Sequence, residues 1–154
     1  MRKKGEWIFL FVIAFSSVFF SAGQGGTQNQ EGFLNWKECV SCHEQIVLSW
    51  QNTRHAKAFE SLKKTSQEGL PACLPCHVTG YDEPGGYVDF ELTPELIGVQ
   101  CEECHGPGKP HITNPGEKSS VISKVGEKKC KKCHTPGQDP NFNYGRKSKL
   151  THSQ

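Results

Sequence analysis

All eight cysteines of this 154-residue chain fall into four copies of one five-residue pattern, Cys-x-x-Cys-His. The cysteines are Cys39 and Cys42, Cys73 and Cys76, Cys101 and Cys104, and Cys130 and Cys133, and the histidines are His43, His77, His105 and His134. On one helical turn, cysteines at i and i+3 lie on one side and can form thioethers to the two vinyl groups of a haem. The histidine at i+4 then lies near that face and can bind the iron. The pattern is the attachment signature of c-type haem and predicts four covalently attached haem c groups.

Paired Cys-x-x-Cys sequences also build zinc ribbons, thioredoxin-type dithiols and disulfide frameworks. None of these alternatives needs a histidine at the fifth position. With 7 histidines in 154 residues, histidine would follow all four cysteine pairs by chance about once in a few hundred thousand sequences. Chance is therefore excluded, and the fifth residue favours haem over the alternatives.

The N-terminus has the features of a secretory signal peptide. Three of the first four residues are basic, residues 7–20 are apolar, and small residues follow. The apolar stretch is shorter than the roughly 20 residues of a spanning helix, so we expect removal of residues 1–23, export to the periplasm and no stable membrane anchor. Polar residues 24–33 predict a disordered leader, and residues 34–154 a tetrahaem cytochrome c domain.

The amount of chain per haem limits the fold. Removing residues 1–23 leaves 131 residues, or about 33 per haem, too few for four separate pockets. The haems are therefore expected to touch one another and to form most of the apolar interior. We predict a mainly α chain with long loops, folded as a compact multihaem cytochrome whose core is four stacked c-type haems.

The charges balance overall but are segregated along the chain. Without residues 1–23 the formal net charge is zero, which gives no indication of nucleic-acid binding. Residues 82–103 contain acidic residues and neither lysine nor arginine, and lysines gather in residues 118–132. The two stretches are either solvated faces or docking patches for a charged redox partner.

The iron ligands on the distal side can be counted from the sequence. The single methionine is Met1, which leaves with the predicted signal peptide, so no iron has a His/Met pair. Apart from the four motif histidines, the chain has His55, His111 and His152. Three distal candidates therefore face four irons.

His55 is expected to bind the iron of a neighbouring site. A helix is predicted over residues 46–62, ending by Gly69, because apolar residues recur there at helical spacing. They are Val47, Trp50, Ala58 and Leu62. Twelve residues separate His43 from His55, a rise of about 18 Å in a helix, too far to reach the other side of the same haem.

His111 is also expected to cross to another haem, because the loop from His105 through residues 106–110 is short and stiffened by two prolines. Elsewhere, residues 93–95 predict a helix start. The alternation in residues 87–92 predicts at most a short strand.

The chain resembles the cytochrome c-554 family of small tetrahaem electron carriers. Beyond the four motifs, the residues that carry the resemblance are Trp50 to Thr53, His55, Ala56 and Ala58; Pro71, Ala72 and Thr79 to Tyr81; Gly98 to Glu102; His105 to Gly108 and His111; Pro140 to Tyr144; and Lys149 to His152. The resemblance implies that His55, His111 and His152 are distal ligands. It pairs His43 with His111, His105 with His152 and His134 with His55, and leaves the haem on His77 five-coordinate.

The resemblance also implies a function. It indicates an exported electron carrier rather than an enzyme, working between a redox donor and a redox acceptor. One of these partners is expected to be a multihaem oxidoreductase, with a role in nitrogen-compound respiration such as hydroxylamine oxidation. Two alternatives stay open: reduction of a small ligand such as nitric oxide at a five-coordinate haem, and a subunit of an extracellular haem filament.

Overall fold

The computed structural model describes residues 32–115 and 120–153. The predicted signal peptide and residues 24–31 of the predicted leader lie outside these residues. The described part consists of short helices joined by long loops, and it contains no strand beyond one isolated antiparallel bridge between Val78 and Ile97. This confirms the predicted mainly α chain with long loops.

Six α-helices and four short 3₁₀ helices are found among the described residues. The α-helices are α1 (Val40–Gln51), α2 (Ala58–Lys63), α3 (Cys101–His105), α4 (Lys109–Thr113), α5 (Glu127–Cys130) and α6 (Tyr144–Lys147). The 3₁₀ helices are Trp36–Cys39, Leu74–Cys76, Pro94–Leu96 and Ser148–Leu150. Within the described ranges, no helix is long and apolar enough to cross a membrane.

The continuous helix predicted over residues 46–62 is wrong, because the chain turns between α1 and α2. The Asn52 side-chain amide donates to the carbonyl oxygen of Leu48 at 2.9 Å, and the Thr53 hydroxyl donates to that of Trp50 at 2.7 Å. Side chains that bond the backbone in this way compete with helix continuation. His55 therefore lies in a turn instead of on a helix face.

Two further local predictions concern the loop before α3. Residues 87–92 form no strand. The helix start predicted at residues 93–95 is a single turn of 3₁₀ helix, Pro94–Leu96, with Pro94 in its first turn. The Thr93 hydroxyl accepts from the backbone N–H of Val88 at 2.8 Å and does not cap this turn.

A small apolar cluster holds α2, the second motif and the loop before α3 together. Its buried members are Phe59, Leu62, Leu74, Val78, Tyr87 and Leu96. Phe33, the last residue of the predicted leader, packs against the cluster, and its N–H donates to the carbonyl oxygen of Gly85 at 3.1 Å. The few buried side chains agree with an interior that needs further apolar groups to fill it.

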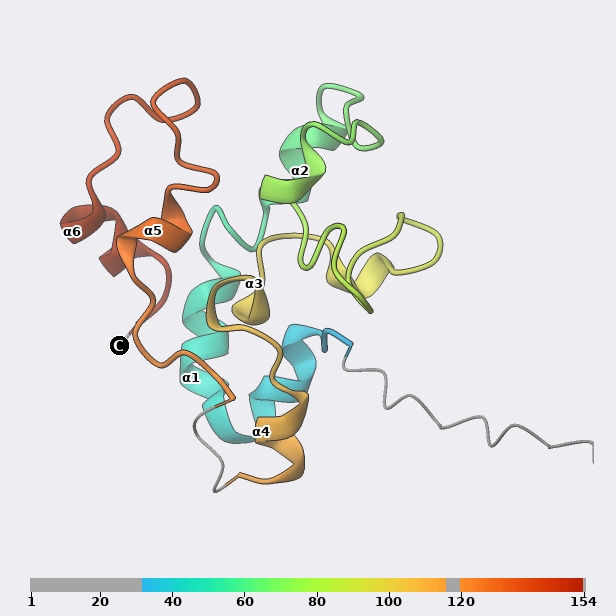
Figure 1. Ribbon diagram of the computed structural model, residues 1–154, viewed down its shortest axis with the longest axis vertical. Helices are drawn as coiled ribbons and strands as arrows, with labels where there is room; N and C mark the ends of the chain where they lie inside the picture. The colour runs from blue at the N-terminus through green and yellow to red at the C-terminus, as the bar shows by residue number, and fades with distance from the viewer. Residues whose placement is uncertain (1–31, 116–119, 154) are drawn as a thin grey trace, which may run out of the picture.

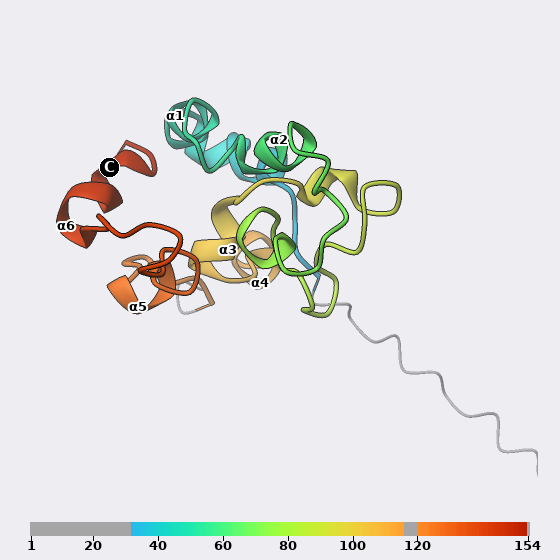
Figure 2. The same ribbon diagram turned by 90° about the horizontal axis from the view of Figure 1, so that it is seen from above.

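The C-terminal helices and the loop after the second motif lie on opposite sides of the molecule. In both views α5 and α6 lie at one end, and the yellow-green loops around residues 80–96 lie at the opposite end (Figures 1 and 2). The helix α3 lies between them, with α4 beside it in both views.

Candidate haem-binding sites

Each Cys-x-x-Cys-His motif forms one site, numbered in chain order. Site 1 is Cys39, Cys42 and His43; site 2 is Cys73, Cys76 and His77; site 3 is Cys101, Cys104 and His105; site 4 is Cys130, Cys133 and His134. Site 3 occupies the whole of α3, as the single helical turn predicts. In site 4 the N–H of His134 donates to the carbonyl oxygen of Cys130 at 2.9 Å, a helical i to i−4 bond.

Sites 1 and 2 depart from a regular helical turn. Site 1 crosses from the 3₁₀ helix into α1, and His43 has φ −124° and ψ 34°, which breaks the helix there. Site 2 contains the 3₁₀ helix Leu74–Cys76, in which Pro75 occupies the first turn. The same Cys-x-x-Cys-His sequence therefore adopts a different backbone conformation at different sites.

The eight cysteines form no disulfide. Several of them instead meet a cysteine of a different site. The Cys39 side chain of site 1 interacts with Cys101 of site 3. The Cys133 thiol of site 4 donates to the carbonyl oxygen of Pro75, within site 2, at 3.7 Å. Cys104 lies close enough to Cys130 for their charges to interact. These contacts place the four sites in the spatial order 1, 3, 4, 2.

The pKa values of several thiols are raised, whereas the interaction with the Cys39 side chain lowers the pKa of Cys101. The hydrogen bond to Cys101, followed by burial, raises the pKa of Cys39. Burial raises the pKa of Cys104 to about 11 and is also the main cause of the raised pKa of Cys133. Because the thiolate is the reactive and metal-binding form, these thiols differ from the low-pKa cysteines of dithiol catalysts.

Six of the seven histidines form three facing pairs. The ring centroids of His43 and His111 are 6.4 Å apart, those of His55 and His134 are 6.0 Å apart, and those of His105 and His152 are 6.1 Å apart. Each pair joins one motif histidine to one histidine from outside the motifs. The pairs are the ones that the family resemblance implies.

The separation of each pair fits a single metal ion between the rings. A metal–imidazole nitrogen bond is about 2 Å long and a ring nitrogen lies about 1 Å from its ring centre, so two imidazoles on opposite sides of one metal have centroids roughly 6 Å apart. The observed 6.0–6.4 Å agrees with this value. Together with a cysteine pair at each site, these imidazoles fit a covalently attached haem.

His77 is the seventh histidine and takes no part in these pairs. Its Nδ1 lies 2.8 Å from the carbonyl oxygen of Ala58 and 3.3 Å from the hydroxyl of Ser61, both on α2. The ring of this motif histidine is therefore oriented by α2. A tautomer with its proton on Nδ1 leaves Nε2 as the donor atom for a metal.

Nδ1 contacts also orient two other motif histidines. His105 Nδ1 bonds the carbonyl oxygen of Ile122, and His134 Nδ1 lies 2.8 Å from Asp139 Oδ2. The hydrogen bond with His134, and then Lys147 at 3.2 Å, lower the pKa of Asp139. A carboxylate or carbonyl bound to Nδ1 fixes the tautomer and makes Nε2 a better ligand.

His55 is positioned by a buried relay of hydrogen bonds. The Trp50 indole N–H donates to the carbonyl oxygen of Val99 at 3.0 Å, and the Val99 N–H donates to the carbonyl oxygen of His55, also at 3.0 Å. Burial and then the charge of His134 lower the pKa of His55. The ring therefore stays neutral at neutral pH, as a metal ligand must.

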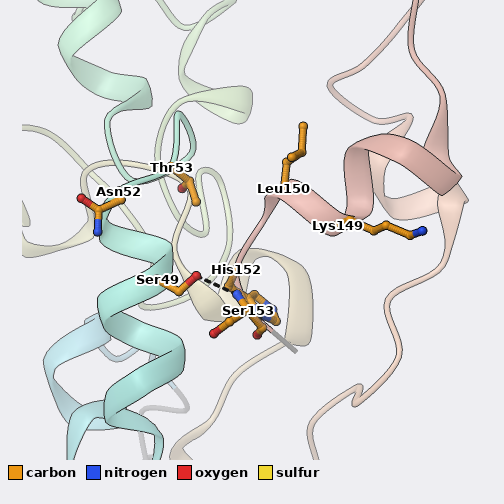
Figure 3. A pocket seen from close by; sticks show the side chains of 7 residues that line it. All are labelled: Ser49, Asn52, Thr53, Lys149, Leu150, His152 and Ser153. Carbon is orange, nitrogen blue, oxygen red and sulfur yellow. Dashed lines mark hydrogen bonds between the residues drawn. The ribbon is translucent and has the colours of Figure 1, made fainter.

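His152 borders an open cavity of about 350 Å³ between α1 and the C-terminal segment (Figure 3). The cavity is lined by Ser49, Asn52, Thr53, Lys149, Leu150, His152 and Ser153. The N–H of Ser153 donates to the Ser49 hydroxyl at 2.7 Å. This bond ties the chain end to α1 and holds His152 opposite His105.

The side chains of Gln100, Glu102 and Glu103, in and next to site 3, connect this site to other parts of the chain. The sequence analysis did not predict this role. Gln100 accepts from the backbone N–H of Trp36 at 2.8 Å. Glu102 is 5% exposed and accepts from the N–H groups of Leu34 and Gly108. In the sequence, both residues lie beside Cys101 within the resemblance, and Glu102 also belongs to the acidic stretch, where it was expected at the surface.

Glu103 joins three sites. It accepts from the N–H of Gly80 beside site 2 at 2.9 Å, and it forms an ion pair with Lys129 beside site 4 at 3.2 Å. The carboxylates of Glu102 and Glu103 are therefore occupied by hydrogen bonds and an ion pair within the fold. Of the acidic stretch 82–103, only the acidic residues from Asp82 to Glu95 can form an acidic surface. Among the described residues, no group of three or more His, Cys, Asp or Glu side chains is placed to hold a bare metal ion.

Known proteins resemble this chain in sequence and in fold. Residues 38–106 match the family described as cytochrome c554 and c-prime. Cytochrome c-554 of Nitrosomonas europaea is 37% identical over 111 residues, which are 62% of this chain and 47% of that protein. The chain thus spans about half the length of this curated relative.

Two solved structures are also similar. Reduced cytochrome c554 from Nitrosomonas europaea has a TM-score of 0.59 and 29% identity, covering 80% of this chain and 84% of that one. The outer cell wall cytochrome OcwA has a TM-score of 0.43 and 20% identity, covering 66% and 37%. The first match confirms the multihaem cytochrome fold expected from the sequence, and the second is too distant to add to it.

Proposed function

We propose that the chain is a tetrahaem c-type electron carrier of the cytochrome c554 family, and that three of its irons are held between imidazole pairs and the fourth by His77 alone. The pairs are His43 with His111, His55 with His134, and His105 with His152. The observation that carries this proposal is the centroid separation of 6.0–6.4 Å in all three. When bound, haem iron supplies a one-electron couple.

The imidazole pairs suit electron transfer because the protein fixes several of the ligands. Asp139 orients His134, the Ile122 carbonyl orients His105, and the bond to Ser49 anchors the residue after His152. Ligands that stay in place in both oxidation states keep the reorganisation energy of electron transfer small. This argument supports a carrier that moves electrons one at a time.

The cysteine contacts support a route through the molecule. Site 1 meets site 3 where the Trp36 N–H donates to Gln100 at 2.8 Å, and site 4 meets site 2 where the Cys133 thiol donates to the carbonyl oxygen of Pro75 at 3.7 Å. Sites 3 and 4 are joined by Glu103 and Lys129. We propose that electrons pass along the order 1, 3, 4, 2, so that sites 1 and 2 are the ends of the route.

The cellular role follows from the family and the predicted signal peptide. We propose a periplasmic carrier that accepts electrons from a multihaem oxidoreductase, such as a hydroxylamine-oxidising enzyme, and delivers them to a second redox protein. Reduction of a small ligand such as nitric oxide is a second candidate. It is favoured by one observation, that His77 faces α2 and is not one of the paired histidines.

Electron paramagnetic resonance of the oxidised, haem-quantified protein tests this proposal. One iron in four is expected to be high-spin, because only His77 lacks a facing imidazole. A protein with no high-spin iron would contradict the open coordination position at His77. Reduction of a small ligand would then be removed as a candidate, and electron transfer would remain. A high-spin fraction of one half or more would contradict at least one of the three pairs.

A further inference from the structure

The loop that follows site 2 forms a lobe at the end of the molecule opposite α5 and α6 (Figures 1 and 2). We call residues 82–95 the acidic lobe. It exposes five carboxylate side chains and contains neither lysine nor arginine; they are Asp82, Glu83, Asp89, Glu91 and Glu95. None of the five forms an ion pair with another described residue. The five carboxylates of the lobe are therefore not neutralised by ion pairs within the described residues.

The centre of the acidic lobe is apolar and exposed. Val88 is 59% exposed, Phe90 47% and Leu92 69%. Asp89 accepts from the N–H groups of Glu91 and Leu92 at 2.9 and 2.7 Å, which holds this turn in shape. An apolar centre within a charged rim is the usual anatomy of a surface that binds another protein.

A hollow of about 390 Å³ opens on the same lobe. It is lined by Tyr81, Asp82, Glu83, Gly85, Gly86, Tyr87, Val88 and Thr93. Carboxylates and tyrosine rings together suit an ammonium or guanidinium group, by charge and by cation–π attraction. Lys63 of α2 makes such a cation–π contact on this lobe, since its Nζ lies 4.1 Å from the Phe90 ring centroid.

The acidic lobe is connected to site 2 by packed side chains. The Phe90 ring stacks on Phe59 with centroids 6.1 Å apart and an interplanar angle of 2°. Phe59 follows Ala58, whose carbonyl oxygen lies 2.8 Å from His77 Nδ1. A protein bound to the lobe would lie next to one end of the proposed electron route.

We propose that the acidic lobe is the docking surface for a redox protein that surrounds its cofactor with lysine or arginine side chains. This inference rests on the proposed function, because it assigns one of the carrier's partners to site 2. Charge complementarity steers such encounters and raises the association rate by about 10-fold to 1,000-fold at low ionic strength.

A second copy of this chain is a weaker candidate for the partner. Its lysines near α5 are partly neutralised within the molecule, Lys129 by Glu103 at 3.2 Å and Lys131 by Glu127 at 2.8 Å. Lobe and lysines also lie at opposite ends (Figure 1), so pairing them would give an open head-to-tail chain of molecules.

The test measures electron exchange between the haem-loaded protein and a cationic probe, mitochondrial cytochrome c, by stopped flow at several salt concentrations. The lobe variant combines Glu83→Gln, Glu91→Gln and Glu95→Gln. The control combines Glu38→Gln, Glu44→Gln and Glu68→Gln, which changes the net charge equally at exposed positions outside the lobe. The lobe variant is expected to react about ten-fold more slowly at low salt, and the control within about two-fold of the parent. At 1 M salt, where the Debye length is about 3 Å, the difference should vanish.

Equal rates for the two variants would overturn the docking surface. Head-to-tail association of the parent at low salt, abolished in the lobe variant, would overturn it in favour of a second copy. A Leu92→Ser variant should slow exchange at every salt concentration, because it removes exposed apolar area from the centre. The spin-state measurement is independent: one high-spin iron in four with equal exchange rates would refute the docking surface alone.

Discussion

Replacing His55 by alanine removes one imidazole from the pair that it forms with His134. The rings are 6.0 Å apart, and the methyl group of alanine cannot reach a metal ion between them. His134 should keep its place, because Asp139 holds its Nδ1 at 2.8 Å. The iron of site 4 is therefore expected to keep its proximal ligand and to lose only the distal one.

The size of the effect follows from the count of imidazoles. In the parent chain His77 alone lacks a facing ring, so one iron of four is expected to be high-spin. In His55→Ala the iron on His134 joins it, and the fraction rises from one quarter to one half. The other two pairs share no ring with His55.

The assay is electron paramagnetic resonance of the oxidised protein, normalised to haem content. Arg54→Ala is the matched control, since Arg54 is the exposed neighbour of His55 in the same turn. Its spectrum should equal that of the parent. A spin fraction of one quarter in His55→Ala would refute His55 as a ligand, and a change of equal size in Arg54→Ala would show that disturbance of the turn is the cause.

Three other substitutions test the fold and the remaining ligands. His152→Ala should also raise the high-spin fraction to one half, because its ring faces His105 at 6.1 Å. Glu102→Gln should cost about 1–3 kcal/mol, lowering the thermal midpoint by several degrees, because an amide cannot accept on both sides from the two N–H groups that its carboxylate serves. Gly86→Ala should cost at least about 3 kcal/mol, because its Cβ would lie 1.8 Å from a backbone oxygen, whereas Gly126→Ala meets nothing within 4 Å and should change the midpoint little.

Each of these predictions has a contrary result. An unchanged spin fraction in His152→Ala would remove the C-terminal histidine from the ligands. A Glu102→Gln variant as stable as the parent would mean that relief from burying a charge offsets the lost hydrogen bond, since burial raises the pKa of this carboxyl. Equal stability of Gly86→Ala and Gly126→Ala would contradict the close approach of the chain at Gly86.

Sequence reasoning was strongest where function depends on local spacing. The four motifs predicted covalently attached haem c, and together with further matching residues they carried the resemblance to the cytochrome c-554 family. Residues 38–106 match that family, and the fold is similar to that of reduced cytochrome c554. Sequence reasoning was weakest for elements that depend on competition between side chains and backbone. The helix expected through His55 stops at Gln51, because Asn52 and Thr53 bond the preceding turn.

The sequence alone determined the donor inventory: eight cysteines in four motifs, seven histidines, and no methionine beyond Met1. From these it followed that three distal candidates serve four irons. Their pairing was implied by the family resemblance and could not be read from spacing, because each pair joins segments that are far apart in the chain.

Only the tertiary structure decided which rings and sites meet. The turn at residues 52–57 brings His55 to His134, and the bond of Ser153 to Ser49 brings His152 to His105. Buried hydrogen bonds of Gln100 and Glu102 tie the start of the described chain to site 3. Such long-range bonds satisfy buried polar groups wherever the chain happens to cross, and no local sequence pattern encodes the crossing.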